Sequence, residues 1–332
     1  MPNPRKVSVI IRTYTDKRWE YFEKAVESAF AQETPPHEVV LHEIVLVVDH
    51  NPALFERVRN RFPKANVVEN TQPRGSGGAW NMGIAVATGD ILAFLDDDAV
   101  AEPNWLEQLC APYENPNVVG VGGTIEPIWE SGKPSWFPAE FYWVVGCTYK
   151  GMPETLAPMR NLIGCNMSFR REAFENILGF RSEIGHANGK PLGCDETEFC
   201  IRLGQRYPEK LMMHQPPAKV RHHVPASRAK FSYLRQRCFY EGRSKALVAQ
   251  FVGSKDGLAS ERKHTMVTLP QGVLKGLADG LRGDLGGPGR SVAIVTGLAT
   301  AAFSYLFTSV WLRLKSAAGP SAQTQNVPAG AK

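Results

Sequence analysis

The chain has 332 residues, of which 43% are hydrophobic and 21% charged, and its net charge is +5. These values exclude a disordered or fibrous protein and allow one large α/β domain with an appendage, or two modest domains. The six cysteines include no CxxC pair, which argues against a zinc site and indicates a reducing compartment. Because a predicted strand begins directly after the first residues, we expect no signal peptide and a cytoplasmic protein body.

Short apolar runs alternate with helical patterns along the first part of the chain. The pattern predicts strands at 7–11, 43–48, 66–69 and 118–121, and helices at 17–32, 52–61 and 103–109. This alternation is typical of βαβ units and predicts a largely parallel, Rossmann-like central sheet flanked by helices.

A further strand follows Gly89 and ends in three consecutive aspartates. The apolar run 91–95 predicts a strand buried on both faces. Because a core cannot hold bare charges, we expect Asp96, Asp97 and Asp98 at the carboxyl end of this strand, in the crevice where open α/β sheets bind ligands. Crowded carboxylates raise one another's pKa unless a hard cation neutralises them, and Mg²⁺ suits such a site. The alternative is a solvated acidic turn.

Two other segments allow both a structural and a functional interpretation. The glycine-rich stretch from Arg74 to Gly83 precedes a helix, so it is either a phosphate-binding loop or a flexible turn. Between Pro127 and Pro153, seven aromatic residues crowd into a stretch broken by proline and glycine. They form either a hydrophobic flap or ring faces that hold a sugar or a lipid chain.

The second half of the chain contains an acidic pair and a basic segment. Asp195 and Glu196 open a predicted helix, where they either complement the helix dipole or provide a general base. Between Lys219 and Lys263 lie eleven basic and three acidic residues, a net charge of +8, which leaves −3 for the remainder. This asymmetry predicts an anionic partner: phosphate groups, an acidic membrane surface or nucleic acid.

The last apolar run extends from Ser291 to Leu312 without a charge and is flanked by Arg290 and Arg313. Its 22 residues are about the length that spans a bilayer. Hydroxyl side chains moderate its hydrophobicity. We therefore expect membrane contact, either by a single span or by a helix that lies flat on the surface.

Four motifs in order resemble glycosyltransferase family 2, whose members have the GT-A fold and use nucleotide-sugar donors. The motifs are Val-Ser-Val-Ile-Ile-Arg-Thr-Tyr at 7–14, Arg-Gly…Ala-Trp-Asn-Met-Gly at 74–83, the DxD element Leu-Asp-Asp-Asp at 95–98, and the acidic pair before a helix with Arg202. The resemblance implies a GT-A domain at 1–250, with a nucleotide-binding half at 1–125 and an acceptor-binding half at 126–250. Beyond it we expect a helical, membrane-associated segment at 251–315 and a disordered tail at 316–332.

The resemblance also implies roles for individual residues. Those expected to contact the nucleotide sugar are Thr13, Tyr14, Asp49, Arg74, Asp96, Asp97 and Asn166, the last near the transferred sugar. Asp98 would bind the Mg²⁺ or Mn²⁺ that bridges the diphosphate, with Asp96 and His222 as further ligands. The family's acidic pair is Glu-Asp with the second acid as base. Here the order is Asp195-Glu196, so the role of base falls to Glu196 by position.

The resemblance therefore predicts a metal-dependent, inverting glycosyltransferase that uses a nucleotide sugar, with a UDP-sugar favoured. The Gln-x-x-Arg-Trp motif of processive members is absent from the sequence, which favours a single transfer. Residues 143–151 are similar to enzymes that extend sugar-linked polyprenyl phosphates, some with UDP-glucuronate. We therefore expect a lipid-linked or other cell-envelope glycan acceptor at the cytoplasmic face of the membrane, and no nucleic acid partner.

The acceptor would be held by the aromatic segment 129–143 and by the basic segment, where Arg235 and Arg237 lie within reach of its phosphate. Two other classes stay open at this stage. A sugar nucleotidyltransferase also uses carboxylates, metal and nucleotide, but it needs neither a membrane segment nor a late base. A non-catalytic, membrane-associated sugar-binding protein would not bind nucleotide in a Mg²⁺-dependent manner.

Overall fold

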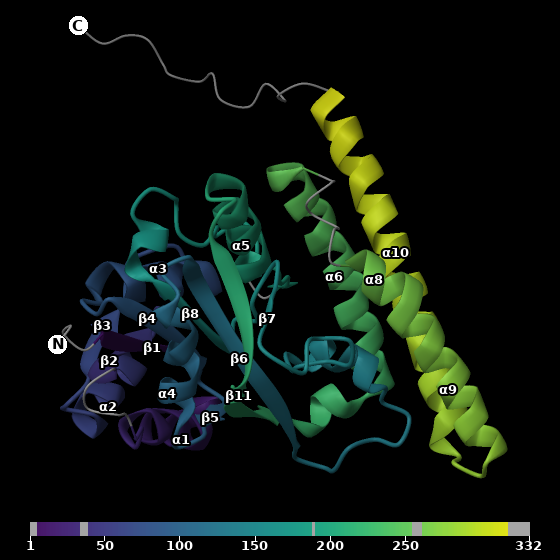
Figure 1. The fold of residues 1–332 in the computed structure, drawn as a ribbon, viewed down its shortest axis with the longest axis horizontal. Coiled ribbons are helices and arrows are strands. Elements are labelled where there is room, and N and C mark those ends of the chain that lie inside the picture. Colours follow the sequence, from purple (N-terminus) through teal and green to yellow (C-terminus); the bar gives the residue numbers. More distant parts are fainter. Residues whose placement is uncertain (1–4, 34–38, 188–189, 254–260, 318–332) are drawn as a thin grey trace, which may run out of the picture.

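The computed structural model describes residues 5–33, 39–187, 190–253 and 261–317. Within these ranges, a sheet of nine strands forms the centre of the molecule and long C-terminal helices lie along one side (Figure 1). Its strands are β1 (Arg5–Thr13), β2 (Val39–Val48), β3 (Asn66–Glu69), β4 (Ile91–Asp96), β5 (Ala99–Ala101), β6 (Val118–Trp129), β7 (Ala157–Pro158), β8 (Asn166–Arg170) and β11 (Leu211–Val224). A separate ribbon pairs β9 (His186–Ala187) with β10 (Lys190–Pro191).

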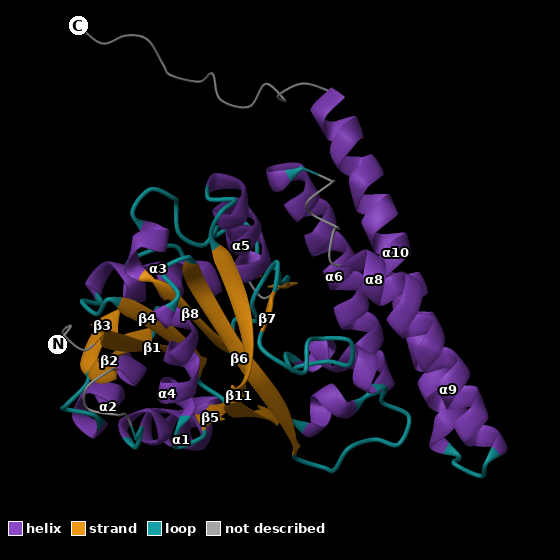
Figure 2. Ribbon diagram, viewed as in Figure 1, coloured by secondary structure: helices purple, strands orange, loops and turns teal. Residues whose placement is uncertain are grey.

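The sheet has the order β3-β2-β1-β4-β8-β6-β11-β5, and β7 pairs with β11 (Figure 2). The first four strands in this order are parallel, as the βαβ pattern predicts. β8 then runs antiparallel to both of its neighbours, β4 and β6, so the second half of the sheet is mixed. The parallel half brings the carboxyl ends of β1, β2 and β4 to the same edge.

Helices cover both faces of the sheet because residues of a strand point alternately to opposite faces. In β1, Val7, Val9 and Ile11 join one core with α1 (Trp19–Phe30), α2 (Pro52–Arg61) and α4 (Trp105–Cys110). Ile10 joins a second core on the opposite face with α3 (Ser76–Val86) and α5 (Asp195–Arg206). The short helical turns are η1 (Asp16–Arg18), η2 (Ala111–Glu114), η3 (Ala139–Val145), η4 (Arg171–Phe174), η5 (Ala226–Ala229) and η6 (His264–Thr268).

The C-terminal helices are α6 (Phe231–Val252), α8 (Glu261–Lys263), α9 (Leu269–Leu281) and α10 (Gly286–Ala317). They pack on the sheet domain, since Ala293 and Ile294 of α10 belong to the same apolar core as β1. Among the described residues, α10 alone is long and apolar enough to cross a membrane, judged by length and composition. The predicted tail at 316–332 overlaps the end of α10, and residues 318–332 lie outside the described part of the chain.

Candidate active site

A cavity of about 1120 Å³ lies where the carboxyl ends of β1 and β4 meet the start of α5. Most of the residues predicted for the site line it together, although they are distributed over much of the sequence. They are Thr13, Tyr14, Asp49, Arg74, Asp96, Asp97, Asp98, Asp195, Glu196 and His222. The cavity also has walls from α6 and α10, so it extends from the strand ends to the C-terminal helices.

Arginine and histidine side chains balance the three aspartates. The Arg12 guanidinium lies 3.2 Å from Asp96, while Arg18 lies 3.0 Å from both Asp97 and Asp98. The hydroxyl of Thr13 donates a hydrogen bond of 3.2 Å to Asp97. A solvated acidic turn is therefore excluded for Asp97 and Asp98, because both carboxylates are buried.

His222 approaches the last aspartate from β11. Its Nε2 atom lies 3.1 Å from Oδ1 of Asp98, and its Nδ1 atom lies 3.6 Å from the Cys147 sulfur. Burial opposes the charge on His222, but the carboxylate of Asp98 outweighs it and raises the histidine pKa to about 10. Burial likewise opposes ionisation of Asp98, yet His222 and Arg18 hold its pKa well below the usual range. For Asp97, burial and the neighbouring charge of Asp98 raise the pKa to about 6.

The donor atoms around this pair fit a divalent cation. Ligand atoms of Asp96, Cys165 and His222 lie within 4.8 Å of one another, and Asp98 contacts the same histidine. Carboxylates suit Mg²⁺ and Mn²⁺, and imidazole adds affinity for transition metals. Of the predicted ligands, Asp96 and His222 therefore belong to one cluster with Cys165, which the sequence did not indicate, and Asp98 adjoins this cluster through its contact with His222.

The glycine-rich segment is the amino-terminal end of α3 and is tied to the end of β2. The amide of Gly75 donates a 3.0 Å hydrogen bond to Asp49 Oδ2, and Asn70 donates one of 2.6 Å to Oδ1. Gly75 has a φ of 123°, which a residue with a side chain rarely adopts. Tyr14 and Arg74 both line the cavity and are exposed.

The acidic pair Asp195 and Glu196 forms the start of α5, directly after a residue with a strained backbone. Cys194 precedes the helix with a φ of 72° in the left-handed region. Asp195 then accepts a 2.7 Å hydrogen bond from Ser76 of α3, and Glu196 is half-buried beside it. Burial and the charge of Asp195 raise the pKa of Glu196 well above the usual carboxyl value. Both acids therefore face the cavity rather than only complementing the helix dipole.

Asn166 does not line the cavity. Its side chain is fully buried, and its Oδ1 atom accepts a 2.8 Å hydrogen bond from the Trp105 indole. Its Nδ2 atom donates to the carbonyl oxygens of Thr124 and Ala218 at 3.1 and 2.9 Å. Because both N–H donors are used and the side chain is fully buried outside the cavity, we assign Asn166 to the packing of β8 and not to sugar binding.

Of the predicted acceptor-binding residues, Phe141 and Trp143 line the cavity and Trp129 does not; likewise Arg237 lines it and Arg235 does not. Sequence reasoning missed Arg18, because its contact with the aspartates depends on how η1 follows β1. It also missed the contribution of α10, whose Leu298 and Tyr305 form part of the wall.

A Rossmann-like half with an aspartate cluster at its strand ends, followed by a mixed half that carries a second acidic pair, defines a GT-A glycosyltransferase. The chain belongs to glycosyl transferase family 2, whose family model matches residues 8–178. A glucosyl-dolichyl phosphate glucuronosyltransferase of Haloferax volcanii is 38% identical over 247 residues, which cover 73% of this chain and 77% of the relative.

Two solved structures share the fold. The mannosyltransferase PcManGT from Pyrobaculum calidifontis, in complex with GDP-Man and Mn²⁺, has a TM-score of 0.55 and 19% identity, over 96% of this chain and 81% of that one. GalNAc-T7 with UDP, GalNAc and Mn²⁺ has a TM-score of 0.51 and 17% identity, over 74% of this chain and 51% of that one. At these identities the likeness concerns the GT-A fold alone.

Proposed function

We propose that this protein is a metal-dependent, inverting glycosyltransferase that moves a sugar from a UDP-sugar to a hydroxyl of a polyprenyl-phosphate-linked sugar. Its site would face the cytoplasm at a membrane surface. One observation carries the proposal: a single cavity joins the strand-end aspartates to Glu196 and to the basic side chains of α6. The Haloferax relative is a glucosyl-dolichyl phosphate glucuronosyltransferase, which supports a glucuronosyl group as the transferred sugar and a lipid-linked glucose as the acceptor.

The donor would lie along the strand ends. Tyr14 offers an exposed ring for the base. In Asp49, Oδ1 already contacts Asn70 and His50, but Oδ2 accepts only the Gly75 amide and retains a lone pair for a ribose hydroxyl. Arg74 supplies a guanidinium at the mouth of the pocket. Asp96 would complete the ribose side, since it ends β4 next to these groups.

Asp98 and His222 would hold the cation, with Asp96 beside them. When bound, Mg²⁺ or Mn²⁺ neutralises the charge that develops on the diphosphate leaving group, an effect of several kcal/mol. Arg18, already in contact with Asp97 and Asp98, keeps a fixed positive charge at the same edge of the cavity.

Glu196 would act as the general base. Its carboxylate takes the proton of the acceptor hydroxyl while that oxygen attacks the anomeric carbon, and the bond from that carbon to the diphosphate breaks. Attack from the side opposite the leaving group inverts the anomeric centre. A raised pKa suits this role, because a base is most effective when its pKa approaches the working pH.

The test is a donor screen with a glucosyl polyprenyl phosphate as acceptor. We expect release of UDP from UDP-glucuronate that depends on Mn²⁺ or Mg²⁺, with a β-linked product from the α-linked donor by NMR. Release of GDP or dTDP instead would overturn the UDP donor, and an α-linked product would overturn inversion. Synthesis of a nucleotide sugar from UTP and a sugar phosphate would make the protein a nucleotidyltransferase.

A further inference from the structure

α10 exposes more large apolar side chains than it buries. Its fully buried side chains are three hydroxyl residues, Ser291, Ser304 and Thr308, together with Ala293 and Ile294 near its start. Its large apolar residues are exposed at helical spacing, among them Val292, Val295, Phe303, Leu306, Val310 and Leu314. Soluble helices turn the apolar face toward the core. Most of the large apolar side chains of α10 therefore point away from the protein.

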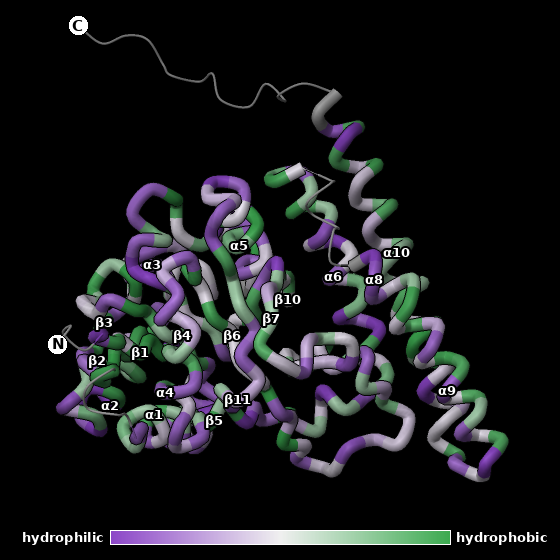
Figure 3. The backbone as a smooth tube through the Cα atoms, in the orientation of Figure 1, coloured by the Kyte–Doolittle hydropathy of each residue, from purple (hydrophilic) through white to green (hydrophobic). Residues whose placement is uncertain are grey.

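α9 repeats this distribution. Its glycines face α10, since a Cβ on Gly276 would lie 2.6 Å from the carbonyl oxygen of Gly287. Leu274, Leu277 and Leu281 are exposed on the other side, and Leu281 is 92% exposed. Hydrophobic segments recur along both helices at the outer edge of the molecule (Figure 3). Small residues between helices and large apolar residues outside are typical of helices in contact with lipid.

The inner side of α10 contacts the protein from its first residue to its middle. A Cβ on Gly286 would meet the Ser135 carbonyl at 2.6 Å, and one on Gly297 would meet the Phe141 ring at 2.3 Å. Nearer the C-terminus, Ala301 lies against α6, which carries Arg237, Glu241 and Lys245. A span perpendicular to the membrane would draw these charged groups of α6 toward the hydrocarbon, at a cost of about 3 kcal/mol each or more. The packing therefore disfavours a span.

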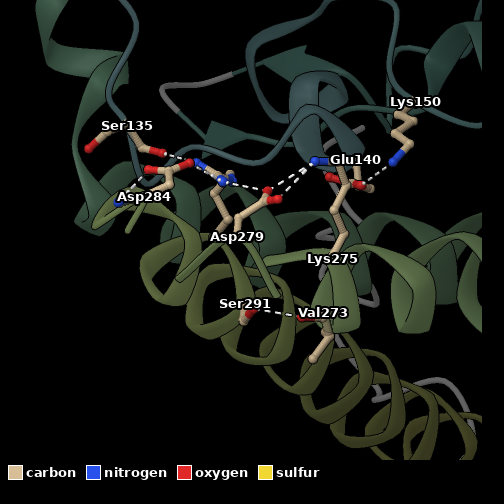
Figure 4. Close-up of polar contacts among 10 residues, drawn as sticks. Ser135, Glu140, Lys150, Val273, Lys275, Asp279, Asp284 and Ser291 are labelled. Carbon is tan, nitrogen blue, oxygen red and sulfur yellow. Dashed lines mark hydrogen bonds and ion pairs between the residues drawn. The ribbon is translucent and has the colours of Figure 1, made fainter. Parts of the chain in front are cut away.

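The charges of the C-terminal helices indicate whether a lipid surface or a second copy of the chain covers the exposed apolar faces of α9 and α10. Residues 261–315 carry seven basic and three acidic side chains. Two of the acids are neutralised. Lys275 lies 2.9 Å from Asp279 (Figure 4). Arg290 lies 2.9 Å from Asp279 and 2.7 Å from Asp284. Arg282 lies beyond the end of α9, and Arg313 and Lys315 lie near the end of α10, all exposed. An antiparallel pair of α10 helices would bring like charges together, whereas anionic lipid attracts them at both ends.

We propose that α9 and α10 lie flat on an anionic membrane, with their exposed apolar faces in the interface. This inference rests on the proposed function, whose acceptor is a membrane lipid. Leu298, Ala301 and Tyr305 of α10 line the active-site cavity from its inner side. The cavity is therefore about one helix diameter, roughly 10 Å, from the lipid. A polyprenyl chain can stay in the membrane while only its phosphate and sugar enter, toward Arg237 and Lys245 on the cavity wall.

The first experiment is flotation of the full chain with phosphatidylcholine vesicles, with and without phosphatidylglycerol. We expect flotation with the anionic vesicles, and at least a tenfold weaker association for the double variant Leu277→Glu/Leu306→Glu. The matched control is Leu178→Glu, which changes an equally apolar residue that is 79% exposed on the sheet domain. Mn²⁺-dependent UDP binding should be equal in all three proteins. A wild-type chain that does not float while it binds UDP overturns this inference and leaves the proposed function intact.

The second experiment separates a flat orientation from a span and from a dimer. Arg282→Cys and Lys315→Cys mark the two ends of the apolar face, and the six native cysteines are buried. With the protein added to sealed vesicles, a membrane-impermeant maleimide should label both positions from outside. Protection of one position until detergent is added would demonstrate a span and overturn the inference. A stable dimer in sedimentation velocity that Leu277→Glu/Leu306→Glu makes monomeric would overturn it in favour of a second copy.

Discussion

The Nε2 atom of His222 lies 3.1 Å from Oδ1 of Asp98, and both side chains are buried at the edge of the sheet. β11 thus delivers a histidine to the aspartate cluster at the end of β4. In this buried ion pair, each group favours the charged form of the other. Asp98 and His222 also offer a carboxylate and an imidazole as metal ligands. A substitution in this pair therefore tests metal binding without changing the acidic pair of α5.

Replacing Asp98 with asparagine should abolish metal-dependent donor binding and leave the fold intact, because the amide has the same shape without the charge. Calorimetry of UDP binding with and without Mn²⁺ measures the effect. Asp16→Asn is the control, since Asp16 is exposed and pairs with Arg57 at 3.3 Å. Normal Mn²⁺-dependent UDP binding by Asp98→Asn would contradict the assignment of Asp98 as a ligand.

Replacing Glu196 with glutamine should lower transfer about 10²- to 10⁴-fold and leave the donor dissociation constant within a small factor, because the base acts only as the proton moves. Asp195→Asn should have a smaller effect, because asparagine can still accept the Ser76 hydrogen bond and Glu196 remains as the base. Single-turnover assays and UDP titrations separate the two quantities. If Asp195→Asn is the inactive variant and Glu196→Gln retains activity, the two acids exchange roles.

His214 should make the fold sensitive to acid. It lies in β11 with 2% exposure, and burial lowers its pKa to about 4, against 6.5 for a free histidine. As the pH falls, His214 therefore becomes protonated in the unfolded chain before it does so in the folded protein. The stability that neutral His214 contributes is fully present above pH 6.5 and is lost as the pH falls toward 4, by up to about 3 kcal/mol.

Chemical denaturation at pH 7 and pH 4.5 measures this dependence. His214→Gln should reduce the difference between the two pH values, because glutamine does not titrate. His42→Gln is the control, since His42 is exposed and should leave the difference unchanged. An equal pH dependence in wild type and His214→Gln would show that other groups cause the acid sensitivity.

The contact between α6 and α10 should not tolerate a methyl group. A Cβ on Gly242 would lie 2.1 Å from the Ala301 carbonyl oxygen, whereas one on Gly204 in α5 has its nearest neighbour at 4.0 Å. Gly242→Ala should therefore lower the free energy of unfolding by about 1–3 kcal/mol. Gly204→Ala should raise it by up to about 1 kcal/mol through helix propensity. Thermal denaturation compares them, and equal effects would contradict this close packing.

The sequence predicts the first half of the chain well because each signal there is local. The bounds of α2 and β3 coincide with the predicted ranges. Asp96 is the last residue of β4, as predicted, because a bare carboxylate cannot lie within the apolar core. Arg18 escapes such reasoning, because nothing near it in the sequence indicates that it bridges Asp97 and Asp98.

The second half is less predictable, since its packing involves distant segments. An asparagine suited to sugar binding, Asn166, instead closes a hydrogen-bond network between strands. The uncharged run at 291–312 suggests an appendage, yet its inner side completes the cavity. A hydropathy pattern gives the length of such a helix, but not which of its faces the protein covers.

The left-handed backbone conformation of Cys194 is stabilised by contacts with α6, a helix distant in the sequence. Its thiol lies 3.3 Å from Glu241, and the amide of the preceding Gly193 donates a 3.1 Å hydrogen bond to Ser244. Both partners belong to α6. A cysteine adopts this conformation at a cost of about 1–2 kcal/mol, so the turn keeps its angle only while α6 is docked. A fragment that ends before α6 would retain the strand-end aspartates and the Ser76–Asp195 hydrogen bond. The turn before α5 would lose both of its contacts with α6, and with them the fixed orientation of Glu196.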